Sequence, residues 1–227
     1  MDSSIPLTFL FIFAGKNMCK FTTIILLCCT FLVISTELKA QNADIEILRS
    51  INSNTSTVGF SKLISNTTTE VAIGVPLAMG VVALIEKDDD LLKDALYVGV
   101  SIGVGGVITQ GLKYSINRPR PITLNDPTIK SYTLETDLSF PSGHTSLAFS
   151  TATALCLKYP RWYVIAPSML WACSVGYSRM NLGVHYPSDV LAGAVVGAGS
   201  AYVTYLVNNW FWKKEGNKKL IGMQAYL

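Results

Sequence analysis

The chain has 227 residues, of which 50% are hydrophobic and only 15% are charged. Soluble domains carry roughly 25% charged residues, so this composition argues against an ordinary cytosolic globule and against intrinsic disorder. A net charge of +3, spread along the chain, argues against a nucleic-acid partner, which would need a concentrated basic surface. The five cysteines lack the spacing of a zinc site or a disulfide framework, and we expect them to be small buried apolar residues.

The first 40 residues have the pattern of a secretory leader. Lys16 and Lys20 form a basic region, residues 21–34 form an apolar core, and Ala40 precedes the expected cleavage point. Two alternatives remain open, a true start at Met18 and an uncleaved membrane anchor. Each of them places the chain after Ala40 outside the cytoplasm.

Residues 41–70 are expected to form an amphipathic and polar N-terminal segment. Apolar residues in 44–51 form a partial helical stripe, which would lie at a membrane surface or against other helices. The Ser-, Thr- and Asn-rich stretch 52–69 is predicted to be a polar connection with a short helical piece around residues 60–64.

Five apolar segments follow, and none of them alternates as a half-buried strand does. The sequence therefore predicts an all-α fold, a membrane-embedded helical bundle of about five or six helices within residues 71–212, followed by a basic cytoplasmic tail, 213–227. Several segments are shorter than the ~20 residues that a spanning helix needs, which leaves a compact soluble bundle as the alternative. The segments are 71–85, 95–112, 145–157, 163–177 and 189–207.

Charge placement favours the membrane interpretation. If the chain crosses a membrane at each segment, the tail with its four lysines lies inside, as the positive-inside tendency requires. The same topology places 113–144 and 178–188 together on the outer side. Glycines four residues apart, at 99 and 103 and at 193 and 197, would let helix backbones approach closely in lipid.

Three polar clusters stand out against the apolar background, and two of them hold the only histidines, His144 and His185. The cationic residues alone would be consistent with a basic collar at helix ends, but together with the histidines they predict an anion site. Arg side chains match phosphoryl oxygens bidentately and Lys supplies a point charge. The three clusters are Lys113 to Pro121, Phe140 to Thr145 and Ser178 to Asp189.

The residues around His144 suit phosphate chemistry. Ser142 and Gly143 precede a predicted helix, whose first backbone N–H groups bind anions. Gly143 would let the backbone come close to a ligand. His144 is then placed to give a proton to a leaving group or take one from water.

His185 and Asp189 are separated by one turn at the start of the last predicted helix. A carboxylate at that spacing accepts a hydrogen bond from one imidazole nitrogen and leaves the other free to attack. A capping aspartate beside an incidental histidine is the structural alternative.

These residues resemble the three-part motif of the type 2 phosphatidic acid phosphatase (PAP2) superfamily. Lys113 is followed after six residues by Arg120-Pro121, then comes the Pro-Ser-Gly-His run that ends at His144, and Ser178-Arg179 is followed after five residues by His185 and after three more by Asp189. The resemblance covers about residues 71–210, and no motif residue departs from the pattern.

The resemblance implies an all-α bundle that uses a phosphohistidine intermediate without a metal or other cofactor. His185 would be the nucleophile, Asp189 its orienting partner, and His144 the acid and base. Ser178 would have a supporting role, and Arg118, outside the pattern, would be a headgroup contact or a surface charge. The residues implied to hold the phosphoryl oxygens are Lys113, Arg120, Ser142, Gly143 and Arg179.

The expected substrate is a phosphorylated membrane lipid at the periplasmic face of a bacterial inner membrane, with a lipid A phosphate favoured. Undecaprenyl diphosphate, phosphatidylglycerophosphate and phosphatidate are alternatives. A broad acid phosphatase, a vanadium haloperoxidase and a non-catalytic lipid-binding membrane protein are the other functions to distinguish, because a motif of this kind does not define the substrate.

Overall fold

The computed structural model describes residues 38–124 and 126–224, with side chains from residue 43 to 212. The chain divides into two units, Met1–Ala43 and Asp44–Leu227, and the features that follow belong to the second. Most of the expected leader lies outside the described residues. No strand occurs in the described ranges, so the all-α prediction is confirmed. The α-helices are α2 (Leu38–Asn52), α3 (Val58–Glu86), α4 (Asp89–Ile116), α5 (Gly143–Lys158), α6 (Trp162–Asn181) and α7 (Pro187–Gln224), with short 3-10 turns η2 (Thr55–Thr57) and η3 (Pro121–Leu124).

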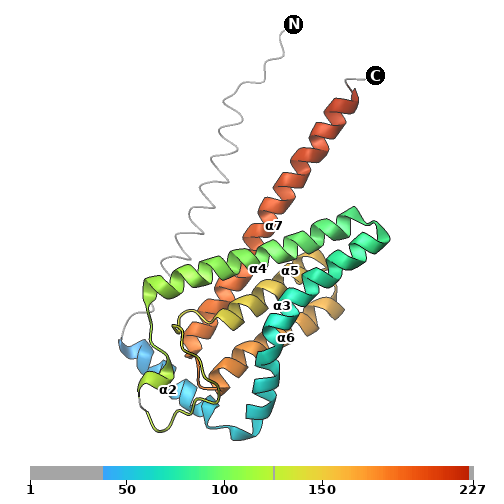
Figure 1. Cartoon of the computed structure of the whole chain (residues 1–227). Helices are drawn as coiled ribbons and strands as arrows, with labels where there is room; N and C mark the ends of the chain where they lie inside the picture. Colours follow the sequence, from blue (N-terminus) through green and yellow to red (C-terminus); the bar gives the residue numbers. More distant parts are fainter. Residues whose placement is uncertain (1–37, 125, 225–227) are drawn as a thin grey trace. The chain divides into compact units, whose positions relative to one another are not determined.

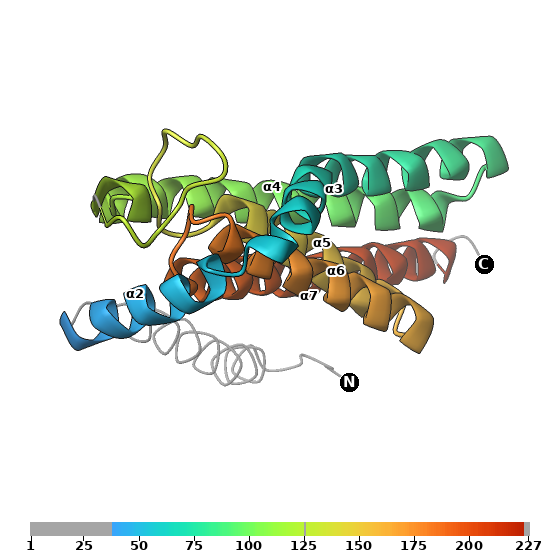
Figure 2. The same ribbon diagram turned by 90° about the horizontal axis from the view of Figure 1, so that it is seen from below.

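Helix α5 is the central element, because it packs against α3, α4, α6 and α7 (Figures 1 and 2). Two glycines of α7 allow its close contact with α5. A Cβ added at Gly193 would lie 2.6 Å from the Ser142 carbonyl oxygen, and one at Gly197 would lie 2.2 Å from the Ser146 carbonyl oxygen. The predicted close approach is confirmed for this pair. The pair in α4 makes no such approach, because a Cβ at 99 would meet only the Pro76 Cβ at 3.9 Å and one at 103 nothing within 4 Å.

The beginning of α3 differs from the prediction. The polar stretch that was expected to be a connection is helical from Val58 onward, as part of a 29-residue helix. Its hydroxyl groups are turned inward and bond to α6: Ser61 donates to the Asn181 side chain at 2.8 Å, and Thr67 accepts from the Trp171 indole at 3.1 Å. Composition alone indicated a loop, because polar residues on a buried helix face look the same as polar residues in a turn.

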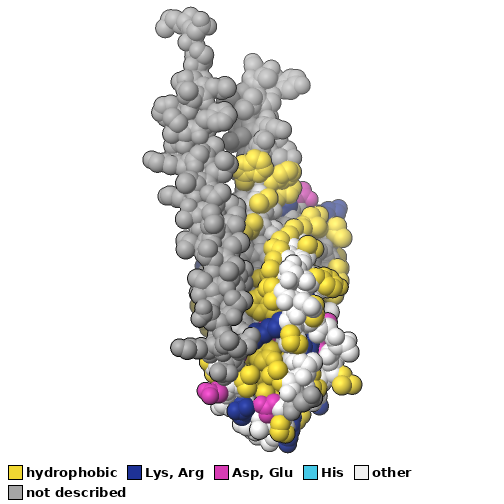
Figure 3. Space-filling model, turned by 90° about the vertical axis from the view of Figure 1, so that its left-hand side faces the viewer, with side chains coloured by type: hydrophobic (Ala, Val, Ile, Leu, Met, Phe, Trp, Pro, Cys, Tyr) yellow, Lys and Arg dark blue, Asp and Glu magenta, His cyan; other side chains and the backbone are white. Residues whose placement is uncertain are grey.

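Among the described residues, three helical stretches are long and apolar enough to cross a membrane: Thr55–Glu86, Asp89–Leu124 and Pro187–Trp212. Large apolar side chains on them are exposed, for example Ile85 at 75% and Val107 at 74%. Hydrophobic side chains cover much of one face of the described chain (Figure 3). Cys173 is exposed on α6 instead of buried as predicted, because apolar side chains also occupy the outer surface. These features are typical of a protein embedded in lipid.

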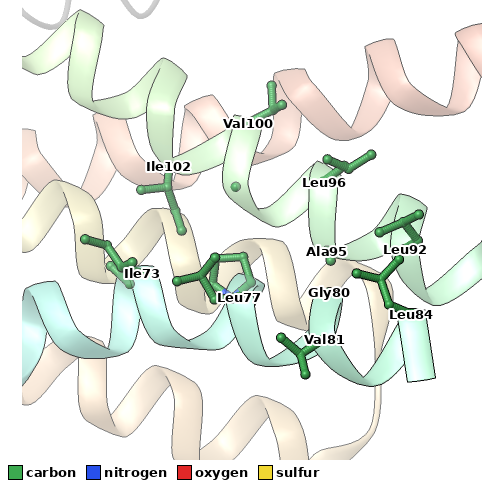
Figure 4. A pocket seen from close by; sticks show the side chains of 13 residues that line it. Ile73, Leu77, Gly80, Val81, Leu84, Leu92, Ala95, Leu96, Val100 and Ile102 are labelled. Carbon is green, nitrogen blue, oxygen red and sulfur yellow. The ribbon is translucent and has the colours of Figure 1, made fainter. Parts of the chain in front are cut away.

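An apolar groove of about 610 Å³ runs between α3 and α4 (Figure 4). It forms where Gly80 and Ala95 leave space between side chains such as Leu77, Val81 and Leu96. Both walls belong to candidate membrane spans, and the groove contains no residue of the polar clusters. Its position and lining suit contact with lipid chains.

Candidate active site

The chain segments that carry the three clusters meet at one end of the bundle. The segment that links α4 to α5 and the turn between α6 and α7 lie there together with α2, away from the turn between α3 and α4 (Figure 1). This confirms the expectation that 113–144 and 178–188 share one side. Lys113 lies in the last turn of α4, His144 in the first turn of α5 and Arg179 in the last turn of α6.

His185 lies in the turn before α7 and is 1% exposed. Its Nδ1 is 3.5 Å from Asp189 Oδ2, and its Nε2 is 3.2 Å from Arg120 Nη1. Burial, assisted by Arg120, lowers the pKa of His185 to about 4, although Asp189 acts in the opposite direction. The imidazole is therefore neutral at pH 7, with Nδ1 turned to the carboxylate and Nε2 turned to a buried cation.

Asp189 is fully buried and is held by hydrogen bonds of its own. Ser139 Oγ donates to its Oδ2 at 2.5 Å, and the backbone N–H of Tyr186 donates to the same oxygen at 3.0 Å. Ser139 Oγ is also 3.4 Å from His185 Nδ1. The carboxylate thus has a defined orientation toward the imidazole. The predicted pairing of His185 with Asp189 is present in the structure.

The three cations of the predicted phosphate site are buried and paired with carboxylates of the segment before α5. Lys113 Nζ lies 2.8 Å from Asp137 Oδ2, and Arg120 Nη2 lies 3.0 Å from Glu135 Oε2 and also pairs with Asp137. Arg179 Nη2 pairs with the other oxygen of Glu135. Two acidic side chains are therefore the partners of the cations that were predicted to hold phosphoryl oxygens.

These pairings hold both carboxylates ionised. Burial acts to raise the pKa of Glu135, but Arg179 and Arg120 beside it bring the pKa below its ordinary value. Burial likewise opposes ionisation of Asp137, yet Lys113 and Arg120 hold the pKa of that carboxyl at about 2. The site without a ligand is therefore close to charge balance.

His144 belongs to the same electrostatic group. Burial and the nearby Arg179 lower its pKa to about 4, while Glu135 acts in the opposite direction. Its imidazole is neutral at pH 7 in the absence of a ligand. An anionic ligand that brings negative charge to this position would favour the protonated form.

A hydrogen-bond donor without a partner and a region of open space lie near the paired cations and His144. Arg179 donates to Ser65 Oγ at 2.6 Å through Nη1, but its buried Nε has no hydrogen-bond partner among the described residues. Ser142 accepts from Thr145 Oγ1 at 2.9 Å and does not cap α5 with its own hydroxyl. A Cβ added at Gly143 would meet nothing within 4 Å. The start of α5 thus presents helix N-terminal N–H groups to an open space, as an anion site requires.

Residues 94–213 match the family model described as the PAP2 superfamily, which covers more than half of the chain. This protein belongs to the PAP2 superfamily. The motif resemblance is thereby confirmed, and the bundle's contacts explain how the three PAP2 clusters converge.

Two relatives and one solved structure indicate the range of the superfamily around this chain. It is 31% identical over 123 residues to an undecaprenyl-diphosphatase of Sulfolobus acidocaldarius, with 52% of this chain and 59% of the relative covered. It is 32% identical over 117 residues to a lipid A 1-phosphatase of Rhizobium etli, with 49% of each chain covered. The chain therefore spans about half the length of these curated relatives.

One structural neighbour is a transmembrane PAP2-type phosphatidylglycerolphosphate phosphatase of Bacillus subtilis. It superposes with a TM-score of 0.68 at 22% identity and covers 83% of this chain and 95% of its own. This likeness supports the fold. Within the described ranges, no group of three or more His, Cys, Asp or Glu residues is arranged to bind a metal ion.

Two further residues of the clusters have partners that the sequence did not identify. Arg118 is partly shielded, and it is not the free surface charge of one alternative, because its guanidinium bonds to Asp189 Oδ1 at 2.7 Å and to Asp44 Oδ2 at 2.9 Å. The other alternative, a headgroup contact, stays a prediction. Ser178 is buried and donates to the Val175 carbonyl of its own helix at 2.7 Å. Arg118 is therefore a further partner of Asp189, and Ser178 stabilises the end of α6.

Several further site residues lie outside the PAP2 motif, and sequence reasoning missed them. Gly183 has φ of 71°, and an added Cβ would lie 2.3 Å from the Lys130 carbonyl oxygen, so the turn before His185 requires glycine. Its place inside the third cluster was the only available signal. The others contact the site through the fold and left no pattern in the sequence: Asp44, Ser65, Glu135, Asp137 and Ser139.

Proposed function

We propose that this protein is a metal-independent phosphatase that hydrolyses a phosphate ester of a membrane lipid through a phosphohistidine intermediate. One observation carries the proposal: the buried His185 and the half-buried His144 both lie within the electrostatic field of Arg120 and Arg179, and His185 Nε2 lies 3.2 Å from Arg120 Nη1. A nucleophile and an acid are what phosphoryl transfer needs beside a cationic cradle. A module that only bound an anion would need the cations alone.

In the first step, His185 Nε2 attacks phosphorus and the bond to the ester oxygen breaks. His144, protonated when the anionic substrate is bound, gives its proton to that oxygen, so the alcohol leaves uncharged. Asp189 stabilises the positive charge that the phosphorylated imidazole acquires. In the second step, His144 takes a proton from water, the hydroxide oxygen bonds to phosphorus, and the bond to Nε2 breaks to release phosphate and neutral His185.

The charge that develops on the equatorial oxygens has to be stabilised by donors already in place. Lys113, Arg120 and Arg179 supply cationic donors, and the backbone at Gly143 with the Ser142 hydroxyl supplies neutral ones. The unpartnered Nε of Arg179 supports this assignment, because a buried donor without a partner is costly unless a ligand satisfies it. A substrate phosphate would replace the carboxylates of Glu135 and Asp137 as the partner of these cations.

The favoured substrate is a lipid A phosphate, presented at the periplasmic face of a bacterial inner membrane. The exposed apolar helices and the similarity to a lipid A 1-phosphatase support this choice. Undecaprenyl diphosphate is the second candidate, supported by the similarity to an undecaprenyl-diphosphatase. Phosphatidylglycerophosphate and phosphatidate remain in the test panel.

The test is phosphate release by detergent-purified protein in the presence of EDTA. The substrates are lipid A, undecaprenyl diphosphate, phosphatidylglycerophosphate, phosphatidate and a soluble phosphomonoester, each assayed with wild type and with His185→Ala. We expect release from a lipid that is abolished in the variant. A phosphorylated protein trapped by acid quench in wild type, and missing in His185→Ala, would support the covalent step.

The other outcomes favour other functions. Equal rates on the soluble ester would favour a broad acid phosphatase. Dependence on added vanadate, with halide oxidation in place of phosphate release, would indicate a haloperoxidase. Full activity in His185→Ala would refute the covalent mechanism, and no release from any substrate would favour a non-catalytic lipid-binding protein.

A further inference from the structure

Arg118 joins the N-terminal helix to the aspartate of the third PAP2 cluster. One guanidinium nitrogen, Nη1, donates to Asp189 Oδ1 and to Ser188 Oγ, both at 2.7 Å. The other, Nη2, donates to Asp44 Oδ2 of α2 at 2.9 Å. The guanidinium carbon also lies 4.0 Å from the centroid of the Tyr186 ring.

Asp44 is in turn tied to the start of α7. Its Oδ1 accepts from the backbone N–H of Ser188 at 3.0 Å, and its Oδ2 accepts from the Ser188 hydroxyl. Asp44 and Arg118 are both largely shielded from solvent, with side-chain exposures of 11% and 19%. The carboxylates of Asp44 and Asp189 and the guanidinium of Arg118 thus form one hydrogen-bonded group, which Asp189 joins through its Oδ1.

We propose that Arg118 is a positioning residue that orients Asp189 toward His185, and that Asp44 of α2 holds Arg118 in that role. This inference rests on the proposed phosphatase function. Arg118 touches neither His185 nor the paired cations of the phosphate site in any interaction of the described residues. It acts through the carboxylate, whose other oxygen, Oδ2, faces the imidazole.

The geometry explains why such a support is needed. Asp189 Oδ2 and His185 Nδ1 are 3.5 Å apart, which is longer than a good hydrogen bond, so small rotations of the carboxylate decide whether the pair interacts. Arg118 fixes Oδ1 and Ser139 fixes Oδ2, which together define the carboxylate plane. In metal sites, the partners that orient a ligating histidine typically contribute about 10- to 100-fold to metal affinity or activity, and we expect an effect of the same order for this histidine.

Asp44 has an electrostatic task as well as a geometric one. Arg118 alone would neutralise Asp189 and weaken its stabilisation of a cationic imidazole. Asp44 shares the guanidinium charge, which leaves Asp189 more negative toward His185. Loss of Arg118 and loss of Asp44 should therefore shift the pKa of His185 in opposite directions, upward and downward respectively.

The other charged groups that face His185 remain in place in both variants, so they do not obscure the comparison. They are Arg120 from the segment after α4, Arg179 from α6 and Asp189 itself from α7, with Glu135 and Asp137 paired to the arginines.

The experiment compares Arg118→Gln, Arg118→Lys and Asp44→Asn with wild type in the full-length protein, on a lipid substrate and on a soluble phosphomonoester. Arg49→Gln is the matched control, because Arg49 also ties α2 to the rest of the bundle, through a 2.9 Å pair with Asp126, but has no contact with Asp189. The thermal unfolding midpoint of each variant in detergent monitors folding. The full pH dependence of kcat/KM is recorded for each.

We expect Arg118→Gln to lower kcat by about 10- to 100-fold on both substrates with little change in KM. Arg118→Lys should recover part of this loss, and Arg49→Gln should retain wild-type kcat. The acid limb of the pH profile should move upward in Arg118→Gln and downward in Asp44→Asn. A purely structural role for Arg118 and Asp44 would not move the acid limb in opposite directions in the two variants.

Three results would overturn the inference. A rise in KM confined to the lipid substrate would make Arg118 a headgroup contact. Losses in Arg118→Gln that follow its unfolding midpoint, with an unmoved acid limb, would make it a structural residue. A kcat of Arg118→Gln equal to that of wild type would mean that Arg118 has no part in the reaction. By contrast, absence of phosphate release by wild type on every substrate would refute the proposed function itself, and the inference with it.

Discussion

Glu135 is the residue whose replacement should strengthen ligand binding. Its carboxylate pairs with Arg120 at 3.0 Å and with Arg179, two of the cations assigned to the phosphate. A phosphate that enters the site has to displace these contacts before it gains its own. Glu135→Gln keeps a hydrogen-bond acceptor of the same size but removes the charge that competes with the ligand.

The size of the effect follows from the interaction that is lost. A hydrogen bond to a charged group contributes about 1.5–3 kcal/mol net, and each 1.4 kcal/mol is tenfold in affinity. Removal of one such competing interaction should therefore lower the inhibition constant of orthovanadate, a phosphate analogue, by about 10- to 100-fold. KM for a soluble phosphomonoester should fall in the same direction.

The assay is inhibition of phosphate release by vanadate, with Glu86→Gln as the control. Glu86 is an exposed glutamate at the end of α3, next to the turn that lies away from the site. Its replacement should leave the inhibition constant unchanged. An unchanged or higher constant in Glu135→Gln would contradict the reasoning, because it would mean that the carboxylate does not compete with the ligand for the arginines.

Two further predictions concern packing and pH. Gly197→Ala should lower the thermal unfolding midpoint in detergent, because its Cβ would lie 2.2 Å from a backbone carbonyl oxygen and overpacking costs about 1–3 kcal/mol. Gly103→Ala, whose Cβ would meet nothing within 4 Å, should be neutral or stabilising. Equal unfolding midpoints for the two variants would contradict the close contact between α5 and α7. On the acid side, kcat/KM should be lost below about pH 4, because His185 has its pKa at about 4 and attacks only when neutral, and on the alkaline side it should decline as His144 gives up the proton that it must donate; an acid limb at 6.5 would show an unperturbed nucleophile.

The helices were predictable because their physical signal is local. Long apolar segments without alternation predicted α5 and α6 within a few residues of the observed bounds. Helix α4 begins at Asp89 instead of near residue 95, and α7 continues to Gln224, through most of the stretch that was predicted to be a separate basic tail. The start of α3 was not predictable, since Ser61 and Ser65 are polar yet face inward, and only their partners on α6 justify a helix there. A window of sequence contains no information about a partner that lies more than a hundred residues away.

The same distinction applies to the candidate site. His144, His185 and Asp189 were found because they belong to short, dense clusters with recognisable spacing. Glu135 and Asp137 were missed because nothing in the segment before α5 distinguishes an acidic residue that pairs with Arg120 from one that faces solvent. Their role depends on the path of that segment across the bundle end.

Arg118 illustrates what the fold adds to a motif. From the sequence, a cation two residues before Arg120 is equally consistent with a headgroup contact and a surface charge. In the structure it lies behind Asp189, because the chain after α4 turns sharply at Asn117, where φ is 51°, and carries the guanidinium toward α7 and α2. Asp44 of α2 is thereby linked to His185, the proposed nucleophile, through the side chains of Arg118 and Asp189. An interpretation of α2 as a membrane-surface helix alone would have to account for a buried carboxylate that bonds to Arg118 and to Ser188.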